Sequence, residues 1–203
     1  MLTNKIIWIT GASSGIGEAC AYQFAREKAS LILTSTRAER LAEVQKECIR
    51  LGAQCEILPY DLTDLNHIDE LADKAVSFFG KIDIAFLNAG ISQRSKTVDT
   101  SSEVDRKIMD VNFFAPVRIT KSLLPGMIAQ GGGTIAVTSS IAGKFGFPLR
   151  SAYSSSKFAL YGFFETVQAE YFSDNIRVVM VCPGRVRTAI SCNALEGDGT
   201  KHG

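Results

Sequence analysis

Tyr153 and Lys157 lie four residues apart in the stretch Ser-Ala-Tyr-Ser-Ser-Ser-Lys, and Ser140 precedes the tyrosine by thirteen residues. One helical turn places the phenol and the ammonium side by side on the same helix face. A phenol with a pKa near about 10 exchanges protons poorly at neutral pH. A fixed ammonium nearby favours the phenolate and lowers that pKa. The pair therefore predicts a general acid/base that needs no histidine.

A glycine-rich segment at 10–17 reads Thr-Gly-Ala-Ser-Ser-Gly-Ile-Gly and follows the first predicted strand. Glycines let the backbone approach a pyrophosphate, and a helix that begins there offers free N–H groups and its positive dipole end. The spacing Gly-x-x-x-Gly-x-Gly differs from the Gly-x-Gly-x-x-Gly dinucleotide fingerprint. The segment predicts a dinucleotide phosphate site, and the alternative is a tight turn without a ligand.

The same segment also matches Gly-x-Ser-x-Gly, the nucleophile elbow of hydrolases, with Ser13 as the nucleophile. A hydrolase would need an acid, a downstream histidine and an oxyanion loop from an earlier strand. This match follows the first strand, so no earlier loop exists. The two histidines are His67, at a predicted helix start, and His202, beside the last residue. These features disfavour a hydrolase.

Arg37 follows the second predicted strand, where an acid would bind the 2′-hydroxyl of an NAD ribose. Thr36 beside it is neutral, and a guanidinium suits the 2′-phosphate of NADP. The sequence therefore favours NADP over NAD, and the alternative for the arginine is an ion pair with Glu39.

Two further strand ends carry polar residues. Asp61 follows the third strand and is placed to accept from an adenine amino group, or else to cap the next helix. Asn88-Ala89-Gly90 ends the fourth strand at the carboxyl edge of the sheet, where ligands bind in open α/β folds.

The elements that must position these residues alternate regularly between strand and helix. Several strands are nearly continuous apolar runs, which is typical of a parallel sheet covered on both faces. The pattern predicts one α/β domain over 1–203 with a doubly wound parallel sheet. We predict strands at 5–10, 31–35, 54–60, 82–88, 134–139 and 177–182, and helices at 14–28, 37–51, 64–79, 101–129 and 152–172.

The composition is that of an ordinary globular domain, with 203 residues, 46% hydrophobic, 21% charged, and a net charge of +1. A net charge this small does not indicate binding to nucleic acid or to an anionic membrane. No apolar run approaches the roughly 20 residues that span a bilayer, and no signal peptide is evident. An odd number of cysteines without Cys-x-x-Cys favours reduced thiols and a cytoplasmic location. We expect no metal site.

One helical stretch is apolar on nearly every face, at 158–164, which reads Phe-Ala-Leu-Tyr-Gly-Phe-Phe. A surface helix of a single domain keeps a polar side. The stretch predicts a helix that packs both on its own sheet and on a partner subunit. The alternative is a helix buried under loops of its own chain.

Taken in order, these motifs resemble the short-chain dehydrogenase/reductase family over 5–188. The motifs are Thr-Gly-x-x-x-Gly-Ile-Gly at 10–17, Asp61, Asn88-Ala89-Gly90, Asn112, Ser140, Tyr153-x-x-x-Lys157 and Pro183-Gly184. The resemblance implies a Rossmann fold and an NAD(P)-dependent oxidoreductase. Arg37 and Gly197-Asp198-Gly199 also resemble the dehydrogenase/reductase member 7 branch. The family's usual first Asn before the Asn-Ala-Gly motif is Leu87 here.

The resemblance implies a catalytic tetrad of Asn112, Ser140, Tyr153 and Lys157. Tyr153 would protonate a carbonyl oxygen as hydride arrives, and Lys157 would lower its pKa and hold the nicotinamide ribose. Ser140 would bind the substrate oxygen, and Asn112 would hold a water that relays protons to Lys157. The implied cofactor residues are Gly11, Ser13, Ser14, Gly15, Ile16, Gly17, Arg37, Asp61, Leu62, Asn88, Ala89, Gly90, Tyr153, Lys157, Pro183, Gly184, Val186 and Thr188.

The resemblance further implies a small carbonyl or alcohol substrate and a homodimer or homotetramer. Family members continue through a substrate-covering helical segment, another helix and a seventh strand, so we expect the C-terminal part to be missing after Gly203. The sixth strand would then form an exposed edge. Phe145, Phe147, Leu149 and Ile190 favour an apolar substrate or simply pack a loop. A different class, an NADP-binding sensor without turnover, would not need Tyr153.

Overall fold

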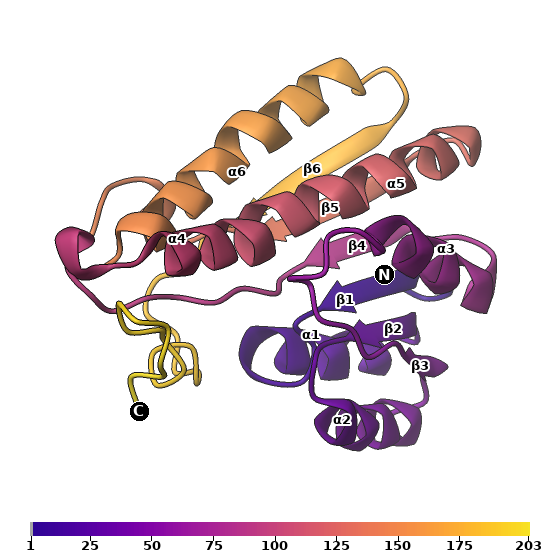
Figure 1. Ribbon diagram of the computed structural model, residues 1–203. Helices are drawn as coiled ribbons and strands as arrows, with labels where there is room; N and C mark the ends of the chain where they lie inside the picture. The colour runs from indigo at the N-terminus through magenta and orange to yellow at the C-terminus, as the bar shows by residue number, and fades with distance from the viewer. Residues whose placement is uncertain (1) are drawn as a thin grey trace.

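The centre of the computed structural model, which describes residues 2–203, is a parallel sheet of six strands (Figure 1). The sheet order is β3-β2-β1-β4-β5-β6, and every neighbouring pair is parallel. All carboxyl ends therefore meet at one edge, which confirms the predicted doubly wound α/β fold. The strands are β1 Ile6–Thr10, β2 Ser30–Thr34, β3 Cys55–Ile57, β4 Ile84–Leu87, β5 Gly133–Thr138 and β6 Ile176–Val181.

Helices cover both faces of this sheet (Figure 1). One face packs on α1 (Gly15–Arg26) and α2 (Ala38–Arg50), and the other on α3 (Ile68–Phe79), α5 (Ala115–Ala129) and α6 (Ser151–Glu170). The strands supply alternate side chains to the two cores because neighbouring residues of a strand point to opposite faces.

The predicted helix at 101–129 is divided in the structure, so its prediction as one element was wrong. It consists of α4 (Ser102–Met109), a π-helical turn (Asp110–Phe114) and α5. Asn112 lies within the turn, and its buried amide bonds both the N–H and the carbonyl of Ile91. Single π-turns inside helices often occur at functional sites.

The third strand is shorter than predicted, since β3 ends at Ile57. Pro59 has no N–H to donate, which interrupts regular pairing. The Leu58 N–H still donates to the Leu33 carbonyl in β2 at 2.8 Å, and the Tyr60 N–H donates to the Ser35 carbonyl, just after β2, at 3.0 Å. The segment therefore stays beside β2 while its backbone leaves the ladder.

The helix predicted at 64–79 begins later, at Ile68. The Asp64 carboxylate accepts the Asn66 N–H at 3.1 Å, so a local turn takes the place of the first helical turn. The other predicted boundaries differ from the structure by only one or two residues.

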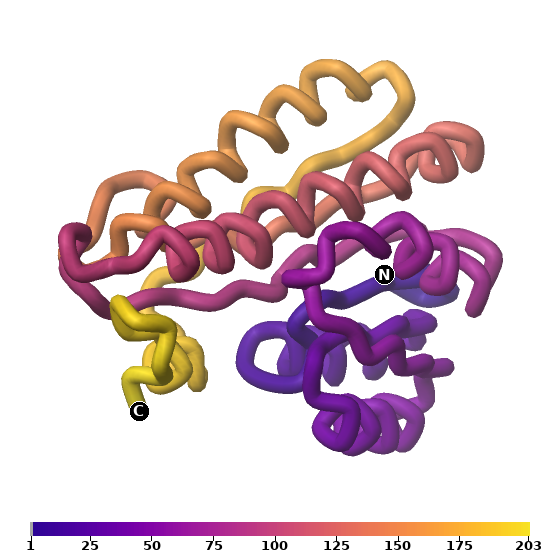
Figure 2. The backbone as a smooth tube through the Cα atoms, viewed as in Figure 1, coloured from indigo at the N-terminus to yellow at the C-terminus, as the bar shows by residue number. Residues whose placement is uncertain are grey.

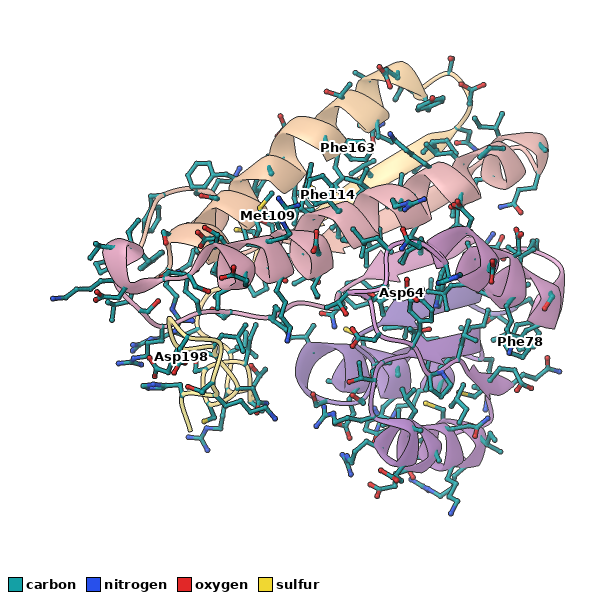
Figure 3. All side chains as sticks on the ribbon, viewed as in Figure 1. Asp64, Phe78, Met109, Phe114, Phe163 and Asp198 are labelled. Carbon is teal, nitrogen blue, oxygen red and sulfur yellow. The ribbon has the colours of Figure 1, made fainter. Side chains whose placement is uncertain are left out.

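The apolar stretch of α6 is partly buried against other residues of its own chain. Phe164 is fully buried, and Phe163 lies edge-on to it and to Phe113, with centroid separations of 5.1 and 6.3 Å. Phe114, from the π-turn, lies edge-on to Phe113 with ring centroids 5.1 Å apart, and both Phe114 and Phe163 are labelled in Figure 3. Phe158 remains 45% exposed on the same helix.

The C-terminal segment after β6 folds back beside the start of α4, as the yellow tube in Figure 2 shows. Leu195 donates its N–H to Ser92 at 2.8 Å and accepts from the Arg94 N–H at 2.7 Å. No strand between residues 2 and 203 pairs with the outer side of β6, where Val179 is 47% exposed. In the same range, no helix combines the length and the apolar character needed to cross a membrane.

A polar pair inside the sheet gives a test of the fold. Trp8 and Thr34 are fully buried, and the indole N–H donates to the threonine hydroxyl at 2.9 Å. Thr34→Val keeps the shape but leaves the N–H unpaired, so urea unfolding should show a loss of about 1–3 kcal/mol. The exposed Thr36→Val is the control and should change stability by less than about 0.5 kcal/mol. A Thr34→Val protein as stable as the wild type would contradict this account.

Candidate active site

One cavity of about 580 Å³ lies at the carboxyl edge of the sheet and gathers nearly all the predicted site residues. Of these residues, only Gly17 and Asn112 do not line it. The predicted residues in its wall are Gly11, Ser13, Ser14, Gly15, Ile16, Arg37, Asp61, Leu62, Asn88, Ala89, Gly90, Ser140, Tyr153, Lys157, Pro183, Gly184, Val186 and Thr188.

The Thr10 hydroxyl joins the ends of β1 and β4 beneath this cavity. It accepts the backbone N–H groups of Asn88 and Ala89, each at 3.1 Å. The Asn88 amide donates to the Thr10 carbonyl at 3.3 Å and accepts from the Thr138 hydroxyl at 3.1 Å. Three neighbouring strands are thereby tied together at their ends.

The glycines of the first turn leave space for this arrangement. Gly11 has φ +67, and a Cβ there would lie 2.8 Å from the Ala89 Cα. A Cβ on Gly17 would lie 2.3 Å from the Gly11 carbonyl oxygen, so this glycine allows α1 to pack against the turn and does not face the cavity. From the other side, Thr188 reaches the turn, because a Cβ on Gly15 would lie 3.0 Å from its methyl carbon.

Arg37 lies over the glycine-rich turn and not against an acid. Its guanidinium donates to the Ser13 hydroxyl at 3.2 and 3.0 Å and to the Ser14 hydroxyl at 2.6 Å. No ion pair with Glu39 occurs, and Arg37 has no carboxylate partner anywhere in residues 2–203. A guanidinium flanked by two hydroxyls is a suitable receptor for a phosphate.

Lys157 is buried beside Tyr153 but turns towards the sheet. Its ammonium donates to the Thr138 carbonyl at 2.8 Å and lies 5.8 Å from the centroid of the Tyr153 ring. Burial lowers the pKa of Lys157 to about 8, because the charged form loses its hydration. The amine is therefore less basic than an exposed lysine.

The predicted direction of the Tyr153 pKa was wrong. Burial raises the pKa of the phenol, and the Ser140 hydroxyl and the Arg150 charge oppose this effect only in part. The lysine does not lower it here because its ammonium is directed to the Thr138 carbonyl and not to the phenol. The phenol consequently holds its proton at neutral pH.

Asn112 acts through contacts behind the cavity. Its Oδ1 accepts the Ile91 N–H at 2.8 Å, and its Nδ2 donates to the Ile91 carbonyl at 2.9 Å and to the Ser156 hydroxyl at 3.0 Å. Ser156 in turn donates to the Tyr153 carbonyl at 2.7 Å. The amide thus connects the π-turn to the helix that carries the tyrosine. Both of its N–H groups are in use, and the water relay stays a prediction.

Several residues of the site were missed from the sequence. The buried Gln93 accepts the Tyr153 N–H at 3.1 Å and donates to the Ser151 hydroxyl at 3.1 Å, which caps the start of α6. The Thr10 hydroxyl joins the ends of β1 and β4, and the Thr138 carbonyl accepts from the Lys157 ammonium. A signal was present for Thr10 and Thr138, which lie at the ends of predicted strands, but not for Gln93, which lies five residues beyond the predicted strand at 82–88.

The comparisons with known proteins agree with this geometry. A family model described as short chain dehydrogenase matches residues 5–198. The chain belongs to the short-chain dehydrogenase family. A Drosophila melanogaster dehydrogenase/reductase SDR family protein 7-like is 41% identical over 206 residues, covering 100% of this chain and 63% of that protein. Human dehydrogenase/reductase SDR family member 7 is 40% identical, covering 98% of this chain and 60% of that protein.

These relatives confirm the resemblance to the member 7 branch, and the chain spans less than two thirds of either of them. Among solved structures, a family member from Burkholderia phymatum in complex with NAD has a TM-score of 0.89 at 27% identity, covering 94% of this chain and 69% of that one. A protein from Beutenbergia cavernae with bound NADP at low occupancy has a TM-score of 0.90 at 29% identity, covering 94% and 76%.

The residues of this family member fit a nicotinamide dinucleotide. The turn at Gly11 has no room for a side chain, its serines and Arg37 present donors, and Lys157 and Tyr153 lie in the same cavity. Within residues 2–203, no group of three or more His, Cys, Asp or Glu side chains is placed to hold a metal ion.

The buried lysine gives a pH-dependent test. Its pKa is lower in the folded protein, about 8, than the ordinary value of 10.5, so the unfolded chain holds more protons between these values. Burial of the charge therefore destabilises the protein by about 3 kcal/mol below pH 8, and this penalty disappears as the pH rises to 10.5. Lys157→Met removes the penalty.

Urea unfolding of the wild type and Lys157→Met should show the gain of the variant shrinking steadily across this pH range. Lys121→Met, on the exposed side of α5, is the matched control for loss of a lysine. A free-energy difference between Lys157→Met and the wild type that stays constant with pH would contradict the burial of a charged amine.

Proposed function

We propose that the protein is an NADP-preferring oxidoreductase that interconverts a ketone or aldehyde and an alcohol. The observation that carries the proposal is one cavity shared by two sets of residues. Ser140, Tyr153 and Lys157 form one set, and the glycine-rich turn with Arg37 forms the other. The first set offers proton transfer to a carbonyl oxygen, and the second offers recognition of a phosphorylated nucleotide.

NADPH, when bound, supplies the hydride. Tyr153 is protonated at neutral pH because burial raises its pKa, so it can donate a proton to the carbonyl oxygen of the substrate. Ser140 would donate a hydrogen bond to the same oxygen and stabilise its developing charge. Lys157, with a pKa of about 8, is suited to return the proton and to hold the nicotinamide ribose.

Reduction is the proposed direction for two reasons. A phenol that holds its proton is ready to act as an acid, and a cell keeps NADP mostly reduced. The substrate is a small carbonyl compound, and the homodimer or homotetramer is supported by Phe114 and Phe158, which are large, apolar and exposed on neighbouring helices.

The hydrolase alternative has little support in the geometry. The Ser13 hydroxyl is buried and accepts from Arg37, which is not a base. His67 is exposed and its ring contacts Asp64 at 2.8 Å, while His202 contacts Glu196. An NADP-binding sensor remains the second candidate, because the same residues would bind the nucleotide without turnover.

Removing the phenolic hydroxyl distinguishes an enzyme from a sensor. Tyr153→Phe should lower kcat for carbonyl reduction by at least about 100-fold, because general acid catalysis contributes that much. The affinity for NADPH, measured by nicotinamide fluorescence, should change little. Tyr161→Phe, which removes a hydroxyl from the same helix, is the control and should retain turnover. Tight NADPH binding with no reduction of any carbonyl by the wild type would favour the sensor.

Arg37 tests the nucleotide preference. Arg37→Gln should weaken NADPH binding by about 10- to 100-fold through loss of charged hydrogen bonds, with NADH affinity nearly unchanged. Arg40→Gln is the matched control, since Arg40 lies in the first turn of α2, three residues after Arg37, but pairs with Glu18 and Glu43. Equal weakening of both nucleotides by Arg37→Gln would show that the guanidinium does not contact a 2′-phosphate.

A further inference from the structure

Arg150 is a half-buried cation at the start of α6, three residues before Tyr153. Its guanidinium donates to the hydroxyl of Ser92, which is itself 1% exposed. The titratable groups that act on Arg150 are the Tyr153 phenol and another cation, Arg94. Within residues 2–203, neither arginine forms an ion pair with a carboxylate.

This placement is electrostatically unfavourable without a ligand. Arg150 occupies the N-cap of a helix of 20 residues, where the positive end of the helix dipole repels a cation. Burial lowers the pKa of Arg150, Tyr153 opposes this effect in part, and the Arg94 charge adds to it, so on balance the surroundings disfavour the charged form. An anion bound there would relieve all of these effects together.

The backbone before Arg150 is also strained. Leu149 has φ +65, a left-handed conformation that a residue with a branched apolar side chain rarely adopts. The conformation is held by two bonds, from the Ser95 N–H to the Leu149 carbonyl at 3.3 Å and from the Arg150 N–H to the Phe147 carbonyl at 3.2 Å. Such strain is concentrated at functional sites, where it fixes a side chain in place. Here the side chain that it positions is Arg150.

We propose that Arg150, held by Ser92 and with Arg94 beside it, binds an anionic oxygen group on the carbonyl substrate. Residues three apart on a helix share a face, so a molecule whose carbonyl meets Tyr153 can reach Arg150 with a second group. A guanidinium binds a carboxylate or a phosphate through paired hydrogen bonds. Ile91 and Ile190 line the cavity together with Tyr153 and offer an apolar contact for the body of the substrate.

This inference rests on the proposed carbonyl reduction, and matched substrates separate the two. The probes are meta- and para-acetylbenzoate, para-acetylphenyl phosphate, and the methyl esters of the two benzoates, each assayed with NADPH. Arg150→Gln should lower kcat/KM for the anionic ketones by about 10- to 100-fold, mainly through KM, and should leave the esters within about threefold. A larger loss for the phosphate than for the carboxylates would assign a phosphate as the preferred group, and the reverse would assign a carboxylate.

Two variants control the measurement. Lys96→Gln removes an exposed charge from the same loop as Arg94 and should affect acids and esters alike. Arg150→Lys keeps the charge and should retain part of the preference for anions, with an unchanged unfolding midpoint. An equal effect of Arg150→Gln on acids and esters, or no effect on either, would overturn the assignment.

A binding experiment decides the matter even if no ketone is reduced. In calorimetric titration of the NADPH-loaded protein, the wild type should bind para-acetylbenzoate at least about 10-fold more tightly than its methyl ester, and Arg150→Gln should lose this difference. Absence of reduction with this binding pattern would reject the proposed reaction and keep the anion site. Absence of any preference in the wild type would reject the anion site whether or not the ketones are reduced.

Discussion

The Thr10 hydroxyl is the contact on which the geometry of the site depends. The chain builds β1, β2 and β3 outward in one direction and then returns to place β4 on the other side of β1. The crevice between β1 and β4 is therefore the point where the two halves of the sheet diverge, and ligands bind at such points. By accepting N–H groups from Asn88 and Ala89, Thr10 fixes the width of this crevice. The glycines around it let the two turns approach without side chains between them.

Asp61 is a carboxylate in the wall of this cavity, but within residues 2–203 it does not pair with the cations nearby. Arg37, Lys157 and Arg150 are held by serine hydroxyls or a carbonyl, and none of them pairs with a carboxylate in the part of the chain that the structure describes. Neutral acceptors orient a cation but stabilise it less than an anion does. The site is thus preorganised to gain free energy from anionic ligands, and the burial of Lys157 makes its protonation responsive to what occupies the cavity.

The sequence allowed the order and type of the main elements to be predicted because strand–helix alternation and apolar runs depend on local periodicity. Most of the site residues could be assembled because they follow strands whose positions in a parallel sheet are constrained, and Tyr153 and Lys157 because their spacing matches one helical turn. The π-turn could not be predicted, since it depends on the long-range pairing of Asn112 with Ile91. The prediction that the pKa of Tyr153 is lowered was wrong for a similar reason. The spacing places Lys157 one turn from Tyr153. Only the tertiary structure shows that the Lys157 ammonium donates to the Thr138 carbonyl and that burial has the largest effect on the Tyr153 pKa.

The two ends of the cavity are built differently, and this difference bears on how specificity arises. The nucleotide end is formed by strand ends and helix starts, whose backbone bonds fix them to the sheet. The tyrosine is also fixed, because Gln93 holds its N–H and Ser156 holds its carbonyl. The other end of the cavity is lined by Ile190 and Leu195 from the segment after β6, which bonds to the loop around Ser92. Substitutions in the segment after β6 can therefore change the shape of this end of the cavity while Gln93 and Ser156 still hold Tyr153, since no strand of the sheet depends on that segment.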